Sequence, residues 1–123
     1  MSQRIEEFTR DGKSFIYFDL SEVKTNSEYI VFAETAKECI KKYAENSVLT
    51  ITNIKDVRFD SETKTIIANW MGYNKPYIKQ SAVIGFDGIK RMVLGSILKL
   101  SGRKGMAFVH DKEQAIERLL KGE

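Results

Sequence analysis

The 123-residue sequence predicts a single α/β domain (residues 1–123) with the element order ββαβαβαβα and a four- to five-stranded, mostly parallel mixed sheet. Three observations support this prediction. Short apolar runs alternate with longer stretches in which apolar residues recur at helical spacing. An Asp-Gly pair joins the first two runs and indicates a tight hairpin turn. Strands that alternate with helices form largely parallel sheets with right-handed crossovers.

The first two strands are expected at residues 5–9 and 14–20, on either side of the turn 10–13. In the second of them, Phe15 and Tyr17 alternate with Ile16 and Phe18, so apolar side chains point to both faces. A strand of this kind usually lies in the interior of a sheet, with helices over it.

The first helix is expected over residues 27–45, with Ser27 as its N-cap. A short β-branched strand follows at 48–52, and a second helix begins at Ser61 and ends before Pro76, because proline disfavours helix in the preceding residue. The remaining elements are expected at 81–86 (strand), about 88–100 (helix), 106–109 (strand) and after the cap Asp111 (helix).

The composition excludes several classes of protein. Hydrophobic residues make up 42% and charged residues 30%, with a net charge of only +3. A nucleic-acid partner is not expected, because binding phosphates usually needs a clustered basic excess. The single cysteine cannot form an internal disulfide, and no apolar secretory segment follows Met1. No apolar run approaches the roughly 20 residues of a transmembrane segment. We therefore expect a cytoplasmic protein.

Residues for metal or nucleophilic catalysis are scarce. The only histidine is His110 and the only cysteine is Cys39, so no zinc site with His/Cys spacing can form. His110 is expected at the surface and Cys39 is expected to be a buried, inert thiol. We predict no catalytic residue, no metal and no cofactor. An enzyme would need two converging carboxylates from the ends of predicted elements, namely Asp19, Asp56, Asp60 or Asp87.

The loop Gly85-Phe-Asp-Gly88 joins a predicted strand to a predicted helix. The P-loop pattern is absent, and the three-glycine dinucleotide pattern is absent too. Free backbone N–H groups at a helix N-terminus can bind an anion, but Asp87 would repel it. A tight structural turn is the favoured interpretation, and a ligand or partner contact through Gly85, Asp87 and Gly88 is the alternative.

The helix 88–100 contains more apolar residues than one face needs. Leu94 and Leu98 are expected opposite the core face, one turn apart and beside Arg91. Such a pair could dock a protein partner or a second copy of the chain. The helix could instead lie on an anionic membrane surface, or a neighbouring helix could cover the two leucines. The predicted core face consists of Ile89, Met92, Val93, Ser96, Ile97 and Leu100.

Several segments resemble a known family. They are residues 17–21 (YFDLS), 46–50 (NSVLT) and above all 74–85 (NKPYIKQSAVIG), continued by Gly102-Arg103, Phe108, Asp111, Glu113 and Ala115. They resemble the STAS-like and CRAL-TRIO-like small bacterial domains, related in fold to the anti-sigma-factor antagonists, over nearly the whole chain. The resemblance implies a non-enzymatic role with protein partners, or an apolar ligand as in the lipid-carrier relatives.

The resemblance also raises the question of a phosphorylation switch. STAS antagonists place a phosphorylatable hydroxyl in an Asp-x-Ser/Thr-Gly turn after the third strand. The corresponding stretch here, Asn53-Ile-Lys-Asp56, has neither the hydroxyl nor the glycine. Ser61, which is expected to be the N-cap of the second helix, is a minor candidate, since a phosphate is favoured at a helix N-terminus.

The function predicted from the sequence is a non-enzymatic, cytoplasmic regulatory module that acts through protein contacts. The first alternative is a carrier of a small apolar ligand or lipid, and the second is peripheral contact with a membrane through the helix 88–100. The carrier alternative rests on the aromatic residues Phe15, Phe18, Phe32, Tyr43, Trp70 and Tyr77.

Overall fold

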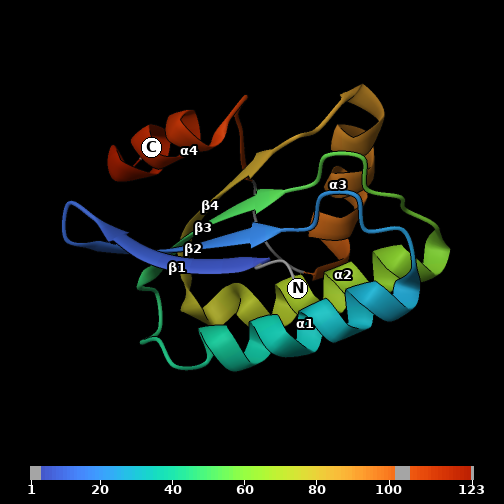
Figure 1. Ribbon diagram of the computed structural model, residues 1–123, viewed down its shortest axis with the longest axis horizontal. Helices are drawn as coiled ribbons and strands as arrows, with labels where there is room; N and C mark the ends of the chain where they lie inside the picture. The colour runs from blue at the N-terminus through green and yellow to red at the C-terminus, as the bar shows by residue number, and fades with distance from the viewer. Residues whose placement is uncertain (1–3, 102–105, 123) are drawn as a thin grey trace.

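The computed structural model describes residues 4–101 and 106–122 of the chain (Figure 1). The predicted order ββαβαβαβα and the mostly parallel mixed sheet are confirmed, with five strands in the spatial order β1-β2-β3-β4-β5. A short 3₁₀ turn, η1, precedes the fourth strand. The elements are β1 (Ile5–Arg10), β2 (Lys13–Asp19), α1 (Asn26–Ile40), β3 (Val48–Asn53), α2 (Ser61–Asn74), η1 (Lys75–Tyr77), β4 (Ile78–Ile84), α3 (Gly88–Ser101), β5 (Ala107–Phe108) and α4 (Lys112–Leu120).

The sheet begins with the predicted hairpin. β1 pairs antiparallel with β2, and the next three pairings are parallel. The two residues of the turn, Asp11 and Gly12, have φ values of 55° and 77°. Positive φ at both positions is what a two-residue turn needs to follow the right-handed twist of the strands. The hairpin forms one edge of the sheet, because β2 also pairs in parallel with β3.

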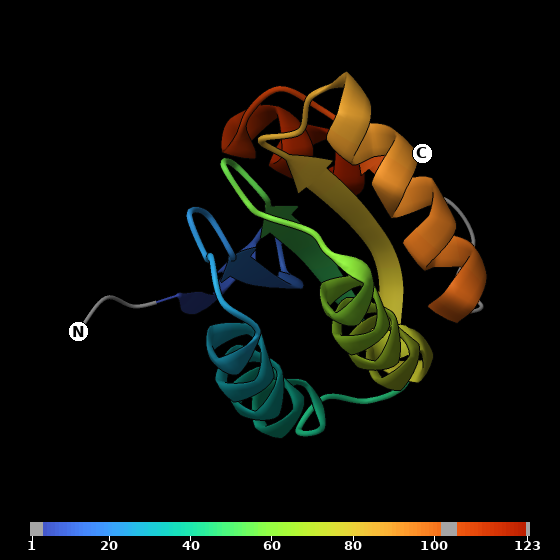
Figure 2. The ribbon, with the colours of Figure 1, turned by 90° about the vertical axis from the view of Figure 1, so that its right-hand side faces the viewer.

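The side chains of β2 divide between two cores, as its two apolar faces predict. Ile16 and Phe18 point into the larger core, which α1, α2 and α3 cover. Phe15 points to the opposite face, where α4 covers the sheet with Ile116 and Leu119. Figure 2 shows the first three helices on one side of the sheet. The alternation of side chains along a strand produces this three-layer arrangement.

Three aromatic rings hold α1 and α2 on the sheet. The Trp70 ring centroid lies 4.9 Å from that of Phe18 and 5.3 Å from that of Phe32. The Phe18 and Phe32 centroids are 5.9 Å apart, and all three pairs meet nearly edge to face. This geometry places the positive edge of one ring against the negative face of the next. Together with Phe15 on the opposite face of the sheet, these three rings are buried. Most of the six aromatic residues proposed as a ligand stripe are therefore core residues.

Two helix caps differ from the prediction, although α2 begins at Ser61 as predicted. Thr25, not Ser27, caps α1, because its side chain accepts the Glu28 backbone N–H while the Glu28 carboxylate accepts the backbone N–H of Thr25. This is a capping box, which satisfies two N–H groups that lack helical partners. Asp60, not Ser61, caps α2 by accepting the Thr63 N–H at 2.8 Å.

Two further boundaries differ from the prediction. α1 ends at Ile40 rather than 45, and the chain turns through Asn46, where φ is 56°. β4 begins at Ile78, earlier than expected, because the η1 turn that contains Pro76 leads directly into it. Helix α3 begins at Gly88, and Asp111 caps α4, as predicted.

Candidate partner-binding surface on helix α3

The turn between β4 and α3 is a close-packed corner. Gly85 has φ of 77°, in the left-handed region that favours glycine. A Cβ atom there would lie 2.5 Å from Asn53 Oδ1 and 2.7 Å from the Lys55 backbone nitrogen. The favoured interpretation of this stretch, a tight turn, matches this geometry.

Asp87 gives the corner its helix cap. Its Oδ1 accepts the Lys90 backbone N–H at 2.9 Å, and its other oxygen lies 3.6 Å from Lys90 Nζ. The backbone N–H of Lys90 lowers the pKa of the Asp87 carboxyl below its usual range. Asp87 thus takes up one of the N–H groups that an anion would need. At Gly88, in contrast, an added Cβ would meet nothing within 4 Å, so close packing does not require a glycine there.

The predicted faces of α3 are wrong only in part: Val93 and Ile97 of the predicted core face do pack in the core, but Ile89, Met92 and Ser96 are exposed. Leu94 is 3% exposed and lies in the larger core, as does Ile97. Leu98 is half-buried against the same core. The exposed apolar residues are instead Ile89 and Met92, each 77% exposed. Leu94 therefore cannot contact a partner, and the helix is rotated about its axis relative to the prediction.

The reason is that α3 is apolar over most of its circumference. A helix of this kind can bury more than one stripe, so its periodicity alone does not choose the inner face. Packing on α2 and β4 selects the side with Leu94 and Ile97. The opposite side, which we call the α3 outer face, consists of the exposed residues Ile89, Met92, Ser96 and Lys99.

Arg91 flanks the α3 outer face and is held in place by two aromatic rings. Its guanidinium carbon lies 4.6 Å from the ring centroid of Phe108 and 5.9 Å from that of Phe86. The two rings themselves meet edge to face at 5.1 Å. A cation over aromatic faces is attracted by their quadrupoles, which limits the conformations of the arginine. Arg91 is thereby fixed towards Phe86 and Phe108, in the same first turns of α3 that carry Ile89 and Met92.

Ser61 lies at the first position of α2, exposed to solvent. Asp60 precedes it and Glu62 follows it, and Asp60 already accepts the Thr63 N–H at 2.8 Å. The two flanking carboxylates would repel a phosphate, which offsets the attraction of the helix N-terminus. The geometry gives Ser61 no separate support as a phosphorylation site.

Three of the four carboxylates weighed for catalysis have structural roles. Asp19 accepts the Ser21 N–H at 2.9 Å, and Asp60 and Asp87 cap α2 and α3. Backbone N–H groups lower the pKa of the last two, which suits neither a general acid nor a general base at neutral pH. In residues 4–101 and 106–122, His, Cys, Asp and Glu form no group of three that could hold a metal ion.

Cys39 is buried in α1, as predicted, at 8% exposure. Burial raises the pKa of its thiol to about 11 from an ordinary 9.0, and the nearby Glu7 carboxylate adds to the effect. A thiol reacts as its thiolate, so this residue is held in its unreactive form.

We expect Cys39 to react with iodoacetamide at pH 8 about a hundredfold more slowly in the folded protein than in urea, because the raised pKa reduces the thiolate fraction by about that factor. A folded pKa above the unfolded one stabilises the protein below pH 9, and this contribution is lost as the pH rises towards 11. Mass spectrometry of quenched samples gives both rates. Equal rates in the two states would show that the thiol is accessible.

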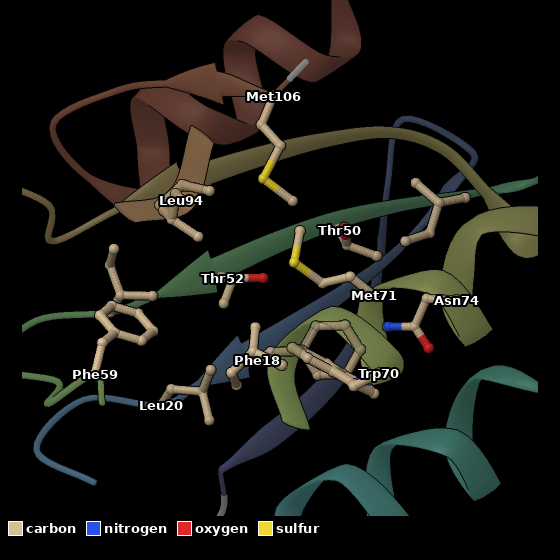
Figure 3. A pocket seen from close by; sticks show the side chains of 14 residues that line it. Phe18, Leu20, Thr50, Thr52, Phe59, Trp70, Met71, Asn74, Leu94 and Met106 are labelled. Carbon is tan, nitrogen blue, oxygen red and sulfur yellow. The ribbon is translucent and has the colours of Figure 1, made fainter. Parts of the chain in front are cut away.

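A cavity of about 20 Å³ lies between α2, α3 and the sheet (Figure 3). This volume accommodates about one water molecule. The carrier alternative needs room for a lipid chain, which this cavity does not provide. Its walls include Phe18, Trp70, Met71, Leu94 and Met106.

None of the helices within the described parts of the chain is long and apolar enough to cross a membrane.

Comparisons with known proteins concern the fold. No protein-family model and no curated protein matches the chain. Among solved structures, the chain is similar to a serine-to-glutamate variant of RsbS from Moorella thermoacetica, with a TM-score of 0.67 and 14% sequence identity. The similarity covers 97% of this chain and 97% of the RsbS chain. The chain therefore has the STAS-like fold of the anti-sigma-factor antagonists, as the sequence resemblance predicted.

Proposed function

We propose that this protein is a non-enzymatic regulatory module of the cytoplasm that binds a protein partner through the α3 outer face. The observation that carries the proposal is the exposure of Ile89 and Met92, each 77%, one turn apart on a helix whose other side is buried in the core. Large apolar side chains that stand together on a surface are typical of contact sites.

The surroundings of these two residues suit a protein contact. Arg91 is prearranged over Phe86 and Phe108, and arginine and methionine are enriched in interfaces. The rigid corner at Gly85 and the cap at Asp87 fix where the helix begins. The similarity in fold to RsbS, a regulatory protein, supports the same class of function. The outer face is also polar at Ser96 and Lys99, so it can remain in water when the partner is absent.

A photo-crosslinking amino acid at position 92, introduced in the organism's own cells, tests the proposal. We expect a cross-link to one defined protein, or to a second copy of this chain. With the purified partner, replacing both Ile89 and Met92 by glutamate is expected to weaken binding about 100-fold or more. Burying two such side chains contributes about 3 kcal/mol or more, and a charge in the interface opposes contact.

Val31 provides the matched control, because it is also an exposed apolar helix residue, at 67%, but lies on α1. The crosslinker at position 31 and the substitution Val31→Glu should leave the partner and its affinity unchanged. The proposal is wrong if both sites capture the same proteins, or if the double variant binds as the parent does. Cosedimentation with anionic vesicles that depends on Ile89 and Met92 would favour membrane contact instead.

A further inference from the structure

The first strand, β1, forms an edge of the sheet (Figure 1). Among the described strands it pairs with β2 alone. The Asp19 backbone N–H donates to the Arg4 carbonyl, so in this antiparallel pair the backbone groups of the even-numbered residues from 4 to 10 point towards β2. The backbone groups of Ile5, Glu7 and Thr9 therefore point away from the sheet. Within the described parts of the chain, no loop or turn hydrogen bond reaches these three residues.

An unpaired strand edge can accept a strand from another chain, and proteins usually protect it. β1 contains no proline and no lysine, and its pairing with β2 is regular, without a bulge. Its exposed charged residues are Glu6, Glu7 and Arg10. Charges of both signs on one strand repel a second copy of that strand in some registers and attract it in others.

Two copies of β1 around a two-fold axis run antiparallel, and the outward backbone groups of residues 5, 7 and 9 then form the hydrogen-bonded pairs. Only two registers meet this condition and overlap the strands over most of their length. In the first, Glu7 lies opposite Glu7 of the second copy, and like charges directly opposite are destabilising. In the second, Glu7 lies opposite Thr9 of the second copy, Phe8 opposite Phe8, and Glu6 opposite Arg10. The second register therefore contains no like-charge pair.

The surroundings of Glu6 and Arg10 extend this complementarity. Within one chain, Lys112 Nζ donates to the Glu6 carboxylate at 2.8 Å, and Arg10 donates to the Glu113 carboxylate at 3.4 Å. In the second register, Lys112 and Glu6 of one copy are followed by Arg10 and Glu113 of the other, so the charges alternate in sign across the junction. Phe8 is half-buried, and aromatic pairs across neighbouring strands stabilise a sheet.

We propose that β1 binds β1 of a second copy of this chain, antiparallel and with Phe8 opposite Phe8, so that two sheets join into one. Backbone hydrogen bonds between the outward groups hold the strands together, and the Glu6–Arg10 pairs set the register. The contact uses none of the residues of the α3 outer face. Its success or failure is therefore independent of the proposed function.

Sedimentation equilibrium of the full chain tests the proposal. We expect a monomer–dimer equilibrium at concentrations of about 0.01–1 mM, because one pair of short strands is a small interface. Glu6→Arg or Arg10→Glu alone places like charges opposite each other at two symmetry-related positions. Each is expected to weaken the dimer about tenfold or more.

The double variant Glu6→Arg/Arg10→Glu restores opposite charges and is expected to associate within about fivefold of the parent. Glu45→Arg is the matched control, since it changes the net charge as Glu6→Arg does but lies in the exposed loop before β3. It should leave the association unchanged. Circular dichroism shows whether each variant is folded.

A cysteine at position 8 tests the register, because Phe8 is the residue that meets its own copy. Phe8→Cys should form an intermolecular disulfide on oxidation. Thr9→Cys should not, because Thr9 lies opposite Glu7 of the second copy and too far from Thr9 for a disulfide. Cys39 is buried and does not compete.

The proposal is overturned if the parent remains monomeric up to about 1 mM. It is also overturned if the two single charge reversals associate as the parent does, if the double variant is as weak as they are, or if Thr9→Cys cross-links as readily as Phe8→Cys. The glutamate substitutions at Ile89 and Met92 should leave this dimer intact. A dimer that these substitutions abolish and Glu6→Arg does not would contradict the β1 contact.

Discussion

Replacing Leu94 by alanine is expected to lower the free energy of unfolding by about 2–5 kcal/mol, the usual range for a buried leucine whose neighbours cannot close the space left behind. Leu94 is 3% exposed and packs in the core that α2, α3 and the sheet share. The same cavity wall and core include Met71 of α2 and Val83 of β4. The loss would therefore loosen the contact of α3 with the rest of the domain.

Met92→Ala is the matched control on the same helix, because Met92 is 77% exposed. Surface substitutions of this kind usually change stability by no more than about 0.5 kcal/mol. Urea unfolding followed by circular dichroism measures both variants. A larger loss at Met92 than at Leu94 would mean that α3 buries the opposite face.

The second large effect is expected at Gly85, where Gly85→Ala should cost more than the roughly 1–2 kcal/mol of left-handed strain alone. The added Cβ would lie 2.7 Å from the backbone nitrogen of Lys55 and 2.5 Å from Asn53 Oδ1. A side-chain oxygen can move aside, but the Lys55 backbone belongs to the loop that follows β3. The carboxyl ends of β3 and β4 would have to separate.

Gly12 allows strain and collision to be measured separately. Its φ is also 77°, but nothing lies within 4 Å of the position that a Cβ would occupy. Gly12→Ala should therefore show the strain alone, and the difference between the two variants gives the cost of the collision. Thermal or urea unfolding provides the comparison. Equal losses would show that the corner at Gly85 adjusts freely.

These variants also separate folding from binding in the proposed function. Leu94→Ala and Gly85→Ala are expected to weaken the partner contact only through loss of the folded state. The glutamate substitutions at Ile89 and Met92 are expected to weaken it in a protein of normal stability. A binding defect with unchanged unfolding is thus specific to the α3 outer face.

Local patterns were sufficient for most of the architecture. The Asp-Gly turn predicted the hairpin, since few residues other than glycine, asparagine and aspartate accept positive φ. The two apolar faces of β2 predicted an interior strand between two layers of helices. Pro76 marked the end of α2 because proline is incompatible with a helix interior.

Where several local solutions were equally good, the sequence-based choice was wrong. Ser27 and Ser61 are acceptable caps, but the real caps are Thr25 and Asp60. The Thr-x-x-Glu pattern from Thr25 to Glu28 is the signal that would have identified the first of them. Asp60 is the stronger acceptor, because it is a carboxylate beside the N-terminal dipole of α2.

The sequence by itself determined the order of the elements, the hairpin and the division of β2 between two cores, because each depends on residues near one another in the chain. Tertiary structure decided which face of α3 is buried and which residues meet at the cavity. Leu94 lies inside because α2 and β4 leave room for it there, although Met92 is as apolar a candidate. Trp70 and Asn74 line the same cavity as Thr50 and Thr52 only because long-range packing sets α2 against β3.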